Sequence, residues 1–350
     1  MANKRTYWAI EAIGTAIHGT GEAPGTYQFV PGVQSVGMST NFNLDQIFQL
    51  GQLEIYQDLE DIPDIELTIE KVIDDTILMY VRAMDAQDAN GAGNKTKALT
   101  ACQNNRVDVL FTVNSDAHDV VGDGAGDLAA YMSGMFLSSA SFSFNTDGYF
   151  TENVSLVGNH QKWFNPAAAI GGAPTDAALD SGDVARRHNF SFDDIGNVPA
   201  PLSTVGATLE DLRIVSVNVS TDLGREEMFS LGERQAYHRY VTFPVEVTCD
   251  IEAYVTDAID FGFNALPEAV NVQSNQTIKF QVDDGFVTSV LDGAANAGAG
   301  KLHEFDLGSK NTLQSVTWNG VSTDGTNATV TYSYRNFNKL DVISQSSTFN

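Results

Sequence analysis

The stretch that decides the fold is Pro63-Asp64-Ile65-Glu66-Leu67-Thr68-Ile69-Glu70, in which apolar and polar residues alternate strictly. Ile65, Leu67 and Ile69 fall on one side of an extended chain, and acidic or hydroxyl residues fall on the other. A period of two predicts a β-strand that has one buried face and one face in water. This stretch therefore indicates a protein built from amphipathic sheets.

Other segments predict more strands and one short helix. Residues 107–113 read VDVLFTV, which predicts a more apolar strand. Residues 139–144 alternate again, and an Asp-Gly turn separates them from a returning run at 152–157, which predicts a hairpin. Residues 127–136 predict a short helix with Asp127 as its N-cap. The expected fold class is mainly β, with a short helix in each domain.

The second half of the chain repeats the first. When Ser35 is aligned with Ser216, residues of the same type or character recur at a constant shift. The matches are Val36 with Val217, Thr40 with Thr221, Phe48 with Phe229, Leu50-Gly51 with Leu231-Gly232, Tyr56 with Tyr237, and Pro63 with Pro244. Later matches, such as Phe111 with Phe280 and Leu137 with Leu313, keep the order while the shift drifts. Insertions in loops between matching strands produce this drift, so we expect two copies of one domain.

The repeat sets the expected domain boundaries. We expect an N-terminal arm and a first domain at 1–165, and a second domain with a C-terminal tail at 207–350. Residues 166–206 are rich in Pro, Gly and Ala, which favours a connection between domains over a core element.

Composition excludes several classes of protein. The chain has 350 residues, 43% of them hydrophobic, which is enough to bury a sizeable core. Its 19 basic and 45 acidic residues give a net charge of −26, which excludes binding of DNA or of an anionic membrane through the net field. No segment is long and apolar enough to span a bilayer, so no membrane partner is expected. Two distant cysteines, Cys102 and Cys249, form neither a disulfide framework nor a zinc site.

A search for catalytic or ligand-binding residues finds one loop that resembles a site. Residues 116–127 collect aspartates and glycines, which suit calcium, but their spacing does not match an EF-hand. The histidines are not paired closely, and Ser181 lies in the predicted connection without a nucleophile elbow. We therefore expect no enzyme activity, no cofactor and no metal. If the loop did bind calcium, the chain would be a β-sandwich adhesin or a calcium-dependent carbohydrate-binding protein.

Two stretches resemble the major tail tube proteins of tailed bacteriophages. They are SVGMSTNFNLDQIFQLGQLEIYQDLEDIPDIELTIEKV at 35–72 and ASFSFNTDGYFTENVSLVG at 140–158. The resemblance implies β-sandwich or barrel domains of the tail-tube type, each with a helix beside it. In that family the inner strands of six domains merge into one β-barrel in each ring. A tandem duplication such as this one implies trimeric rings with pseudo-sixfold symmetry.

The resemblance also implies a function. The chain would be a structural protein whose rings stack into a hollow tube that conducts the viral genome into the host during ejection. Its partners would be further copies of itself and other tail proteins, such as the tape measure, the terminator, and the baseplate or tip. DNA would pass through without specific binding. The protein would be made in the host cytoplasm and reside in the virion tail, although a phage-related injection system would use a similar tube.

Four acidic residues are the predicted lining of the lumen. Glu66 and Glu70 lie on the polar side of the alternating stretch after Pro63, and Glu246 and Asp250 lie on the polar side of the stretch after Pro244. Carboxylates repel phosphates, so a wall of this kind lets DNA slide. On an outer strand the same residues would face the exterior of the tube.

Overall fold

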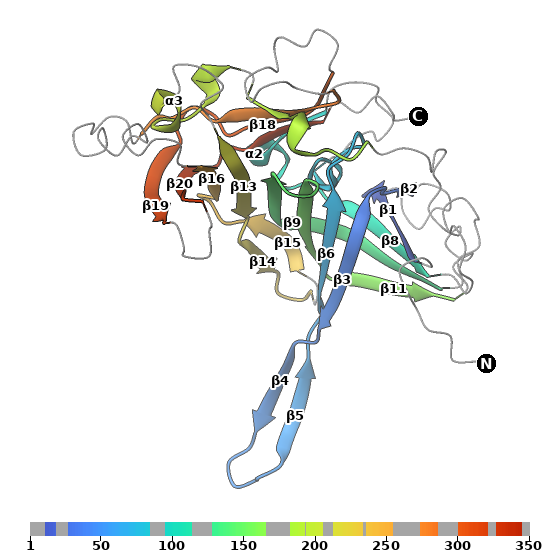
Figure 1. The fold of residues 1–350 in the computed structure, drawn as a ribbon. Coiled ribbons are helices and arrows are strands. Elements are labelled where there is room, and N and C mark those ends of the chain that lie inside the picture. Colours follow the sequence, from blue (N-terminus) through green and yellow to red (C-terminus); the bar gives the residue numbers. More distant parts are fainter. Residues whose placement is uncertain are drawn as a thin grey trace.

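A computed structural model shows a mainly β protein, as the alternation predicts (Figure 1). Its sheets remain open over the residues that it describes. The described ranges are 11–18, 27–84, 95–113, 128–165, 183–192, 194–205, 213–233, 236–254, 274–285, 300–320 and 327–344.

Eight antiparallel strands form the centre of the largest sheet, which we call the spine. In spatial order they are β3 (Val33–Asn41), β6 (Asp64–Val72), β10 (Thr151–Gly158), β9 (Leu128–Asn145), β13 (Ile214–Asp222), β16 (Glu246–Tyr254), β20 (Thr329–Phe337) and β19 (Thr312–Asn319). The junction between the two halves of the chain is the pairing of β9 with β13.

Flanking strands, two hairpins and short helices complete the fold. Around the first half of β9 lie β1 (Glu11–Ile17), β2 (Gln28–Phe29), β8 (Val107–Val113) and β11 (His160–Phe164). A separate sheet contains β12 (Phe190–Ser191), β17 (Lys279–Asp283), β18 (Lys301–Asp306), β21 (Asp341–Ser344) and β7 (Lys95–Ala98). The hairpins are β4 (Leu44–Phe48) with β5 (Ile55–Glu60), and β14 (Arg225–Phe229) with β15 (Ala236–Val241). The helices are α1 (Met79–Ala83), α2 (Leu99–Cys102) and α3 (Leu202–Val205), with 3-10 turns at Arg187–Asn189 and Ile195–Asn197.

The strand pairing repeats within the spine. The order β3-β6-β10-β9 is followed by the order β13-β16-β20-β19, in which each strand has the matching place in the chain. Irregularities also recur: β3 and β13 have a bulge before Ser35 and before Ser216, and β9 and β19 have one before Ser139 and before Ser315. The internal repeat is thus confirmed at the level of strand pairing, whereas the domain boundaries stay a prediction.

The pairing corrects one part of the alignment. Ser35 lies opposite Glu70 and donates to its carboxylate at 3.0 Å, and Ser216 lies opposite Glu252 and donates at 3.3 Å. The counterpart of Glu70 is therefore Glu252, one residue further along the chain than the match of Pro63 with Pro244 implies. The physical reason is one additional residue between β15 and β16, which moves the second copy out of step after the proline.

The predicted helix at 127–136 is wrong, because Leu128–Phe136 is the first half of strand β9. Most of these residues are buried, since flanking strands and the core cover both faces. A strand that is buried on both faces loses its alternation, and its Ala and Met residues then favour a helix in a sequence-based prediction. Asp127 lies outside the described residues. Helices α1 and α2 lie in the first repeat, and the described residues from 213 onward contain no helix.

Several described residues of the predicted connection lie in the core, which the sequence interpretation did not expect. Phe190 and Ser191 form β12 and pair with Val282 and Gln281 of β17. Phe192 is fully buried, and Ala185 and Val198 are nearly so. A strand of two residues is too short to show a period, so the sequence gives no sign of it.

The two halves share one core. Phe142 and Phe144 of β9 lie edge-on to Phe305 of β18, with ring centroids 4.9 and 5.2 Å apart. Phe144 also meets Phe280 of β17 at 5.2 Å. Strands β17 and β18 of the second repeat thus pack on β9 of the first repeat.

A buried histidine joins the two repeats. His303 on β18 is fully buried, and its Nε2 lies 2.7 Å from the carbonyl oxygen of Asp74. A carbonyl only accepts, so Nε2 carries the hydrogen, and Nδ1 accepts from the Ser344 hydroxyl at 3.0 Å. Burial lowers the pKa of His303 to about 4, because the interior disfavours the charged ring.

This burial makes stability depend on pH. Between pH 6.5 and 4 the unfolded chain protonates His303 while the folded chain does not, so stability falls as the pH is lowered through this window. We expect the natural protein to lose up to about 3 kcal/mol more than His303→Gln over that range. Urea unfolding at pH 7, 5.5 and 4.5 measures the difference. Parallel pH dependence in the two proteins would contradict the assignment.

Candidate functional site

The spine ends in two strands that are each paired on one side only within the described residues. At one end β3 pairs with β6, and at the other end β19 pairs with β20. Each outer edge presents backbone donors and acceptors without a strand beside them, which is an arrangement that favours the addition of another strand. Figure 1 shows β3 and β19 at opposite ends of the spine.

The junction inside the chain shows how such edges are covered. Val219 of β13 lies opposite Phe142 of β9, and each is 1% exposed. Their counterparts at the free edges are Met38 of β3, which is 36% exposed, and Trp318 of β19, which is 45% exposed. Positions that the junction buries are therefore left in solvent at the two ends of the spine.

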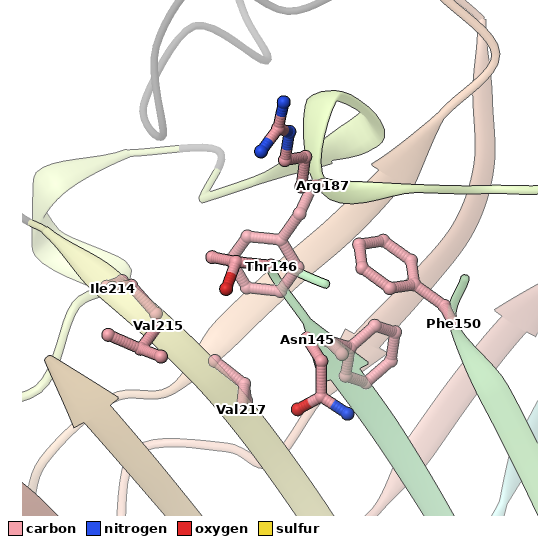
Figure 2. Close-up of a pocket in the computed structure, with 9 residues that line it drawn as sticks. Asn145, Thr146, Phe150, Arg187, Ile214, Val215 and Val217 are labelled. Carbon is pink, nitrogen blue, oxygen red and sulfur yellow. The ribbon is translucent and has the colours of Figure 1, made fainter. Parts of the chain in front are cut away.

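A cavity lies beside the junction, and another lies beside the free edge of β3. At the junction, Val217 and Ile214 of β13 line a cavity of about 60 Å³ together with Phe144 and Phe150 (Figure 2). Beside β3, their counterparts Val36 and Val33 line a cleft of about 500 Å³. Phe144 and Asn145 of β9 line the first cavity, whereas residues of β1, β2 and β8 line the second together with β3.

One face of the spine is mainly polar, although Tyr254 and Phe337 are also exposed on it. Small hydroxyl and amide side chains cover it, and we call this surface the polar face. Its residues include Ser35, Ser39, Asn153, Ser155, Ser139, Ser141, Ser143, Asn218, Ser220, Thr248, Thr331, Ser333, Ser315, Thr317 and Asn319. The opposite face carries the buried residues of the core.

All four residues predicted for the lumen lie on the polar face. Glu66 and Glu246 are exposed, and Glu70 and Asp250 are partly exposed. Glu66 accepts a hydrogen bond from the Ser155 hydroxyl at 2.9 Å. The structure places these carboxylates on one surface, while their role in lining a lumen stays a prediction.

Sequence reasoning missed two acids and one cation on this face. Asp222 and Glu252 continue the alternation of β13 and β16, which a correct register would have shown. Arg335 of β20 is the basic side chain on the polar face of the described spine, and its Nη1 lies 3.7 Å from Glu246. The polar face is therefore strongly anionic.

The two hairpins are counterparts but lie differently. Both have a bulge at the same place, at Tyr56 of β5 and at Tyr237 of β15. The β14–β15 hairpin rests on the body of the chain, whereas the β4–β5 hairpin projects from it (Figure 1). All residues of β4 and β5 are exposed, including several large apolar ones. Those apolar residues are Leu44, Ile47, Phe48, Ile55, Tyr56 and Leu59.

Chemical sites are not evident elsewhere in the described part of the chain. Cys249 is buried, which raises the pKa of its thiol and disfavours the reactive thiolate. No group of three or more His, Cys, Asp or Glu residues suited to a metal occurs among the described residues. The loop at 116–127 and Ser181 lie outside them. None of the described helices has the length and apolar character needed to cross a bilayer.

Comparison with known proteins finds similarity among the solved structures. No family model matches the chain, and no curated protein matches it. Among solved structures, the chain is similar to the tube-terminating cap of the anti-feeding prophage, with 12% sequence identity and a TM-score of 0.32. The match covers 47% of this chain and 94% of that chain.

Proposed function

We propose that this chain is the subunit of a phage-type tail tube, and that β19 of one copy pairs with β3 of the next copy. The observation that carries the proposal is the difference in exposure between Phe142 and Val219 at the junction and Trp318 and Met38 at the free edges. Within one chain the edge strand β9 of the first repeat already pairs with the edge strand β13 of the second repeat. The same pairing between β19 of one copy and β3 of the next would join two copies. Closing the series into a ring removes both free edges.

The junction also supplies the register. Transferred to the free edges, the pairing of β9 with β13 puts Trp318 opposite Met38 and Thr317 opposite Ser39. Hydroxyl residues then continue on the polar face, and apolar residues continue on the core face. The sulfur of Met38 would then contact the indole ring of Trp318, and a contact between sulfur and an aromatic ring is favourable.

Three copies would close the ring. With eight spine strands per chain, a trimer has about 24 strands, and spacing of ~4.8 Å with a tilt of ~40° gives a backbone diameter of roughly 50 Å. The flanking sheets already cover the core face, and packed sheets lie ~10 Å apart. Turning those layers inward would fill much of the bore. The arrangement that leaves a channel turns the polar face inward.

An inner wall of carboxylates and hydroxyls suits passage of a nucleic acid. Phosphates are repelled by the acids, and the short side chains leave a smooth surface. In this proposal the stacked rings form the tail tube of a virion and conduct the genome during ejection. The same surface explains why the chain would conduct DNA without binding it.

Electron microscopy and cross-linking test the proposal together. We expect rings or hollow tubes from the purified protein, and a ring mass of three 37.7 kDa chains, or about 113 kDa. In a Cys102→Ser background, chains carrying Met38→Cys and Trp318→Cys should form disulfide-linked oligomers. The pair Met38→Cys with Thr312→Cys, which lies out of register, is the control. Absence of rings, rings of six chains, or equal cross-linking of both pairs would overturn the proposal.

A further inference from the structure

We infer that the segment 255–273 of one copy adds a strand to the outer edge of β11 in the next copy, as β7 already does to β21 within the chain. This contact rests on the proposed ring and deepens it, because it joins neighbouring copies at a second sheet edge. Residues 255–273 lie outside the described residues, so the support comes from the edge of β11 and from the pairing of β7 with β21.

The flanking sheets of the two repeats have the same strand order. In the first repeat β1, β8, the first half of β9 and β11 lie side by side, and in the second repeat β12, β17, β18 and β21 do. A glycine with a positive φ marks the corner toward the spine in both repeats, Gly134 within β9 and Gly308 after β18. Since β11 follows β10 in the chain as β21 follows β20, β11 is the counterpart of β21.

The sheet of the second repeat has a fifth strand, which comes from the first repeat. Strand β7 pairs with the outer edge of β21, where Thr96 lies opposite Ile343. The amide of Leu99, directly after β7, donates to the carbonyl oxygen of Leu340 at 3.0 Å. A segment of one repeat thus crosses the junction and covers a sheet edge of the next repeat.

The corresponding edge of β11 is open in the described structure. Strand β11 pairs there with β9 only, so its outer backbone groups can accept another strand. Trp163 of β11 and Ser344 of β21 are counterparts, because each lies two residues beyond the partner of a residue in the main core, Met132 or Phe305. Ser344, in the strand that β7 covers, is 1% exposed, whereas Trp163 is 48% exposed.

Strand β11 lies at the end of the spine where a neighbouring copy would join (Figure 1). Its residue Gln161 accepts from the Thr40 hydroxyl at 3.0 Å, and its side-chain amide lies 3.1 Å from the sulfur of Met38. Both partners belong to β3, the strand that would pair with β19 of the neighbour. The open edge of β11 is therefore close to the second repeat of that neighbour in the proposed ring.

The segment 255–273 has the place in the second repeat that β7 has in the first. It lies between β16 and β17, and β7 lies between β6 and β8, which are their counterparts. In the ring, three strand spacings, or ~14 Å, separate β16 from β3 of the next copy, just as three separate β6 from β13. At ~3.3 Å per residue, a segment of this length that runs out and back can extend about 30 Å. It is therefore long enough to reach β11.

Charge favours these two pairings over the exchanged ones. Strand β7 contains Lys95 and Lys97, and it pairs with β21, whose charged residue is Asp341. Strand β11 contains Lys162 and no acid, whereas the segment 255–273 contains three acids and no base. The acids are Asp257, Asp260 and Glu268. Exchanging the two strands would bring like charges together on both edges, which disfavours that arrangement.

A cysteine scan tests the strand addition in assembled rings. In the Cys102→Ser background, chains with Trp163→Cys are mixed with chains that carry one cysteine, placed in turn at each of residues 255–273. We expect inter-chain disulfides at every second position over a short run, because side chains of a paired strand alternate between its two faces. Thr96→Cys with Ile343→Cys in one chain is the matched control, which should form an intra-chain disulfide with or without rings.

Hydrogen exchange provides an independent readout in the natural chain. Amides of residues 160–164 that point outward from the sheet should exchange at least about tenfold more slowly in rings than in the single chain, because a new strand would accept their hydrogen bonds. Residues 341–344, which already pair with β7, should change little.

Two kinds of failure are distinguishable. Rings that form normally but show no cross-links, cross-links without alternation, or unchanged exchange at 160–164 would overturn the strand addition and leave the pairing of β19 with β3 intact. If the natural chain forms no rings while the Thr96–Ile343 control still cross-links, the proposed function fails, and the strand addition fails with it.

Discussion

Trp318→Lys is expected to leave the chain folded but unable to form rings at concentrations at which the natural protein assembles. The Trp318 side chain is 45% exposed in the single chain, so its replacement costs the isolated fold little. In the ring it would take the place of Phe142, which is 1% exposed at the junction. A lysine ammonium would then be buried without a partner, at a position where large aromatic residues contribute most of the binding energy.

The size of this effect follows from the number of interfaces between chains in a ring. Each trimer has three identical interfaces, and loss of about 2 kcal/mol at each one lowers its association constant about thirtyfold. Ring formation should therefore fall by well over a hundredfold, as measured by sedimentation or by counting rings in micrographs. Thr317→Lys is the control, because Thr317 lies on the polar face opposite Ser39 and stays in solvent. An unchanged melting temperature shows that the fold is kept, and normal rings from Trp318→Lys would refute the β19–β3 interface.

Met38→Lys tests the same interface from the other strand. Met38 is 36% exposed and accepts a contact from the Gln161 side chain at 3.1 Å, so it is only partly covered in the single chain. Its counterpart Val219 is buried at the junction. Chains with Met38→Lys should assemble as poorly as chains with Trp318→Lys.

Alternation and repetition made much of the spine predictable. The strict period in 63–70 predicts the orientation of Ile65, Leu67 and Ile69, and all three are buried. The hairpin of β9 with β10 and the match of Leu137 with Leu313 are also confirmed by the pairing. These features depend on local pattern and order, which a sequence carries directly.

What the sequence could not show depends on contacts between distant segments. Nothing in residues 214–222 reveals that β13 pairs with β9, and this pairing defines the two free edges. Burial on both faces concealed the first half of β9, and a single added residue after β15 concealed the match of Glu70 with Glu252. The β14–β15 hairpin is held on the body of the chain by Arg225, which donates to the carbonyl oxygens of Leu137 and Gln103, and by Arg239, which pairs with Asp64. The counterparts of these two arginines, Leu44 and Asp58, differ from them in charge. No residue-type match could therefore point to these contacts.

Reversing the charge of the predicted lumen is expected to turn a conduit into a DNA-binding tube. Changing Glu66, Glu70, Glu246 and Asp250 to lysine moves the net charge of each chain by about eight units while leaving the apolar face untouched. These side chains lie on the polar face, exposed or partly exposed, so rings should still form. Assembled tubes should then bind duplex DNA, with an affinity that falls steeply as salt is raised, because binding releases counterions from the phosphates.

The control and the alternative outcome decide where these residues lie. Four exposed acids away from the polar face, Asp147, Asp183, Asp194 and Glu233, can be changed to lysine to give the same net charge. If the polar face lines the bore, DNA bound by the lumen variant should be protected from nuclease inside the tube, whereas DNA bound by the control variant should be digested. In virions, the lumen variant should slow or block genome release. Ejection at the normal rate, or equal digestion of DNA on both variants, would place Glu66, Glu70, Glu246 and Asp250 outside the channel and reverse the orientation of the sheet in the ring.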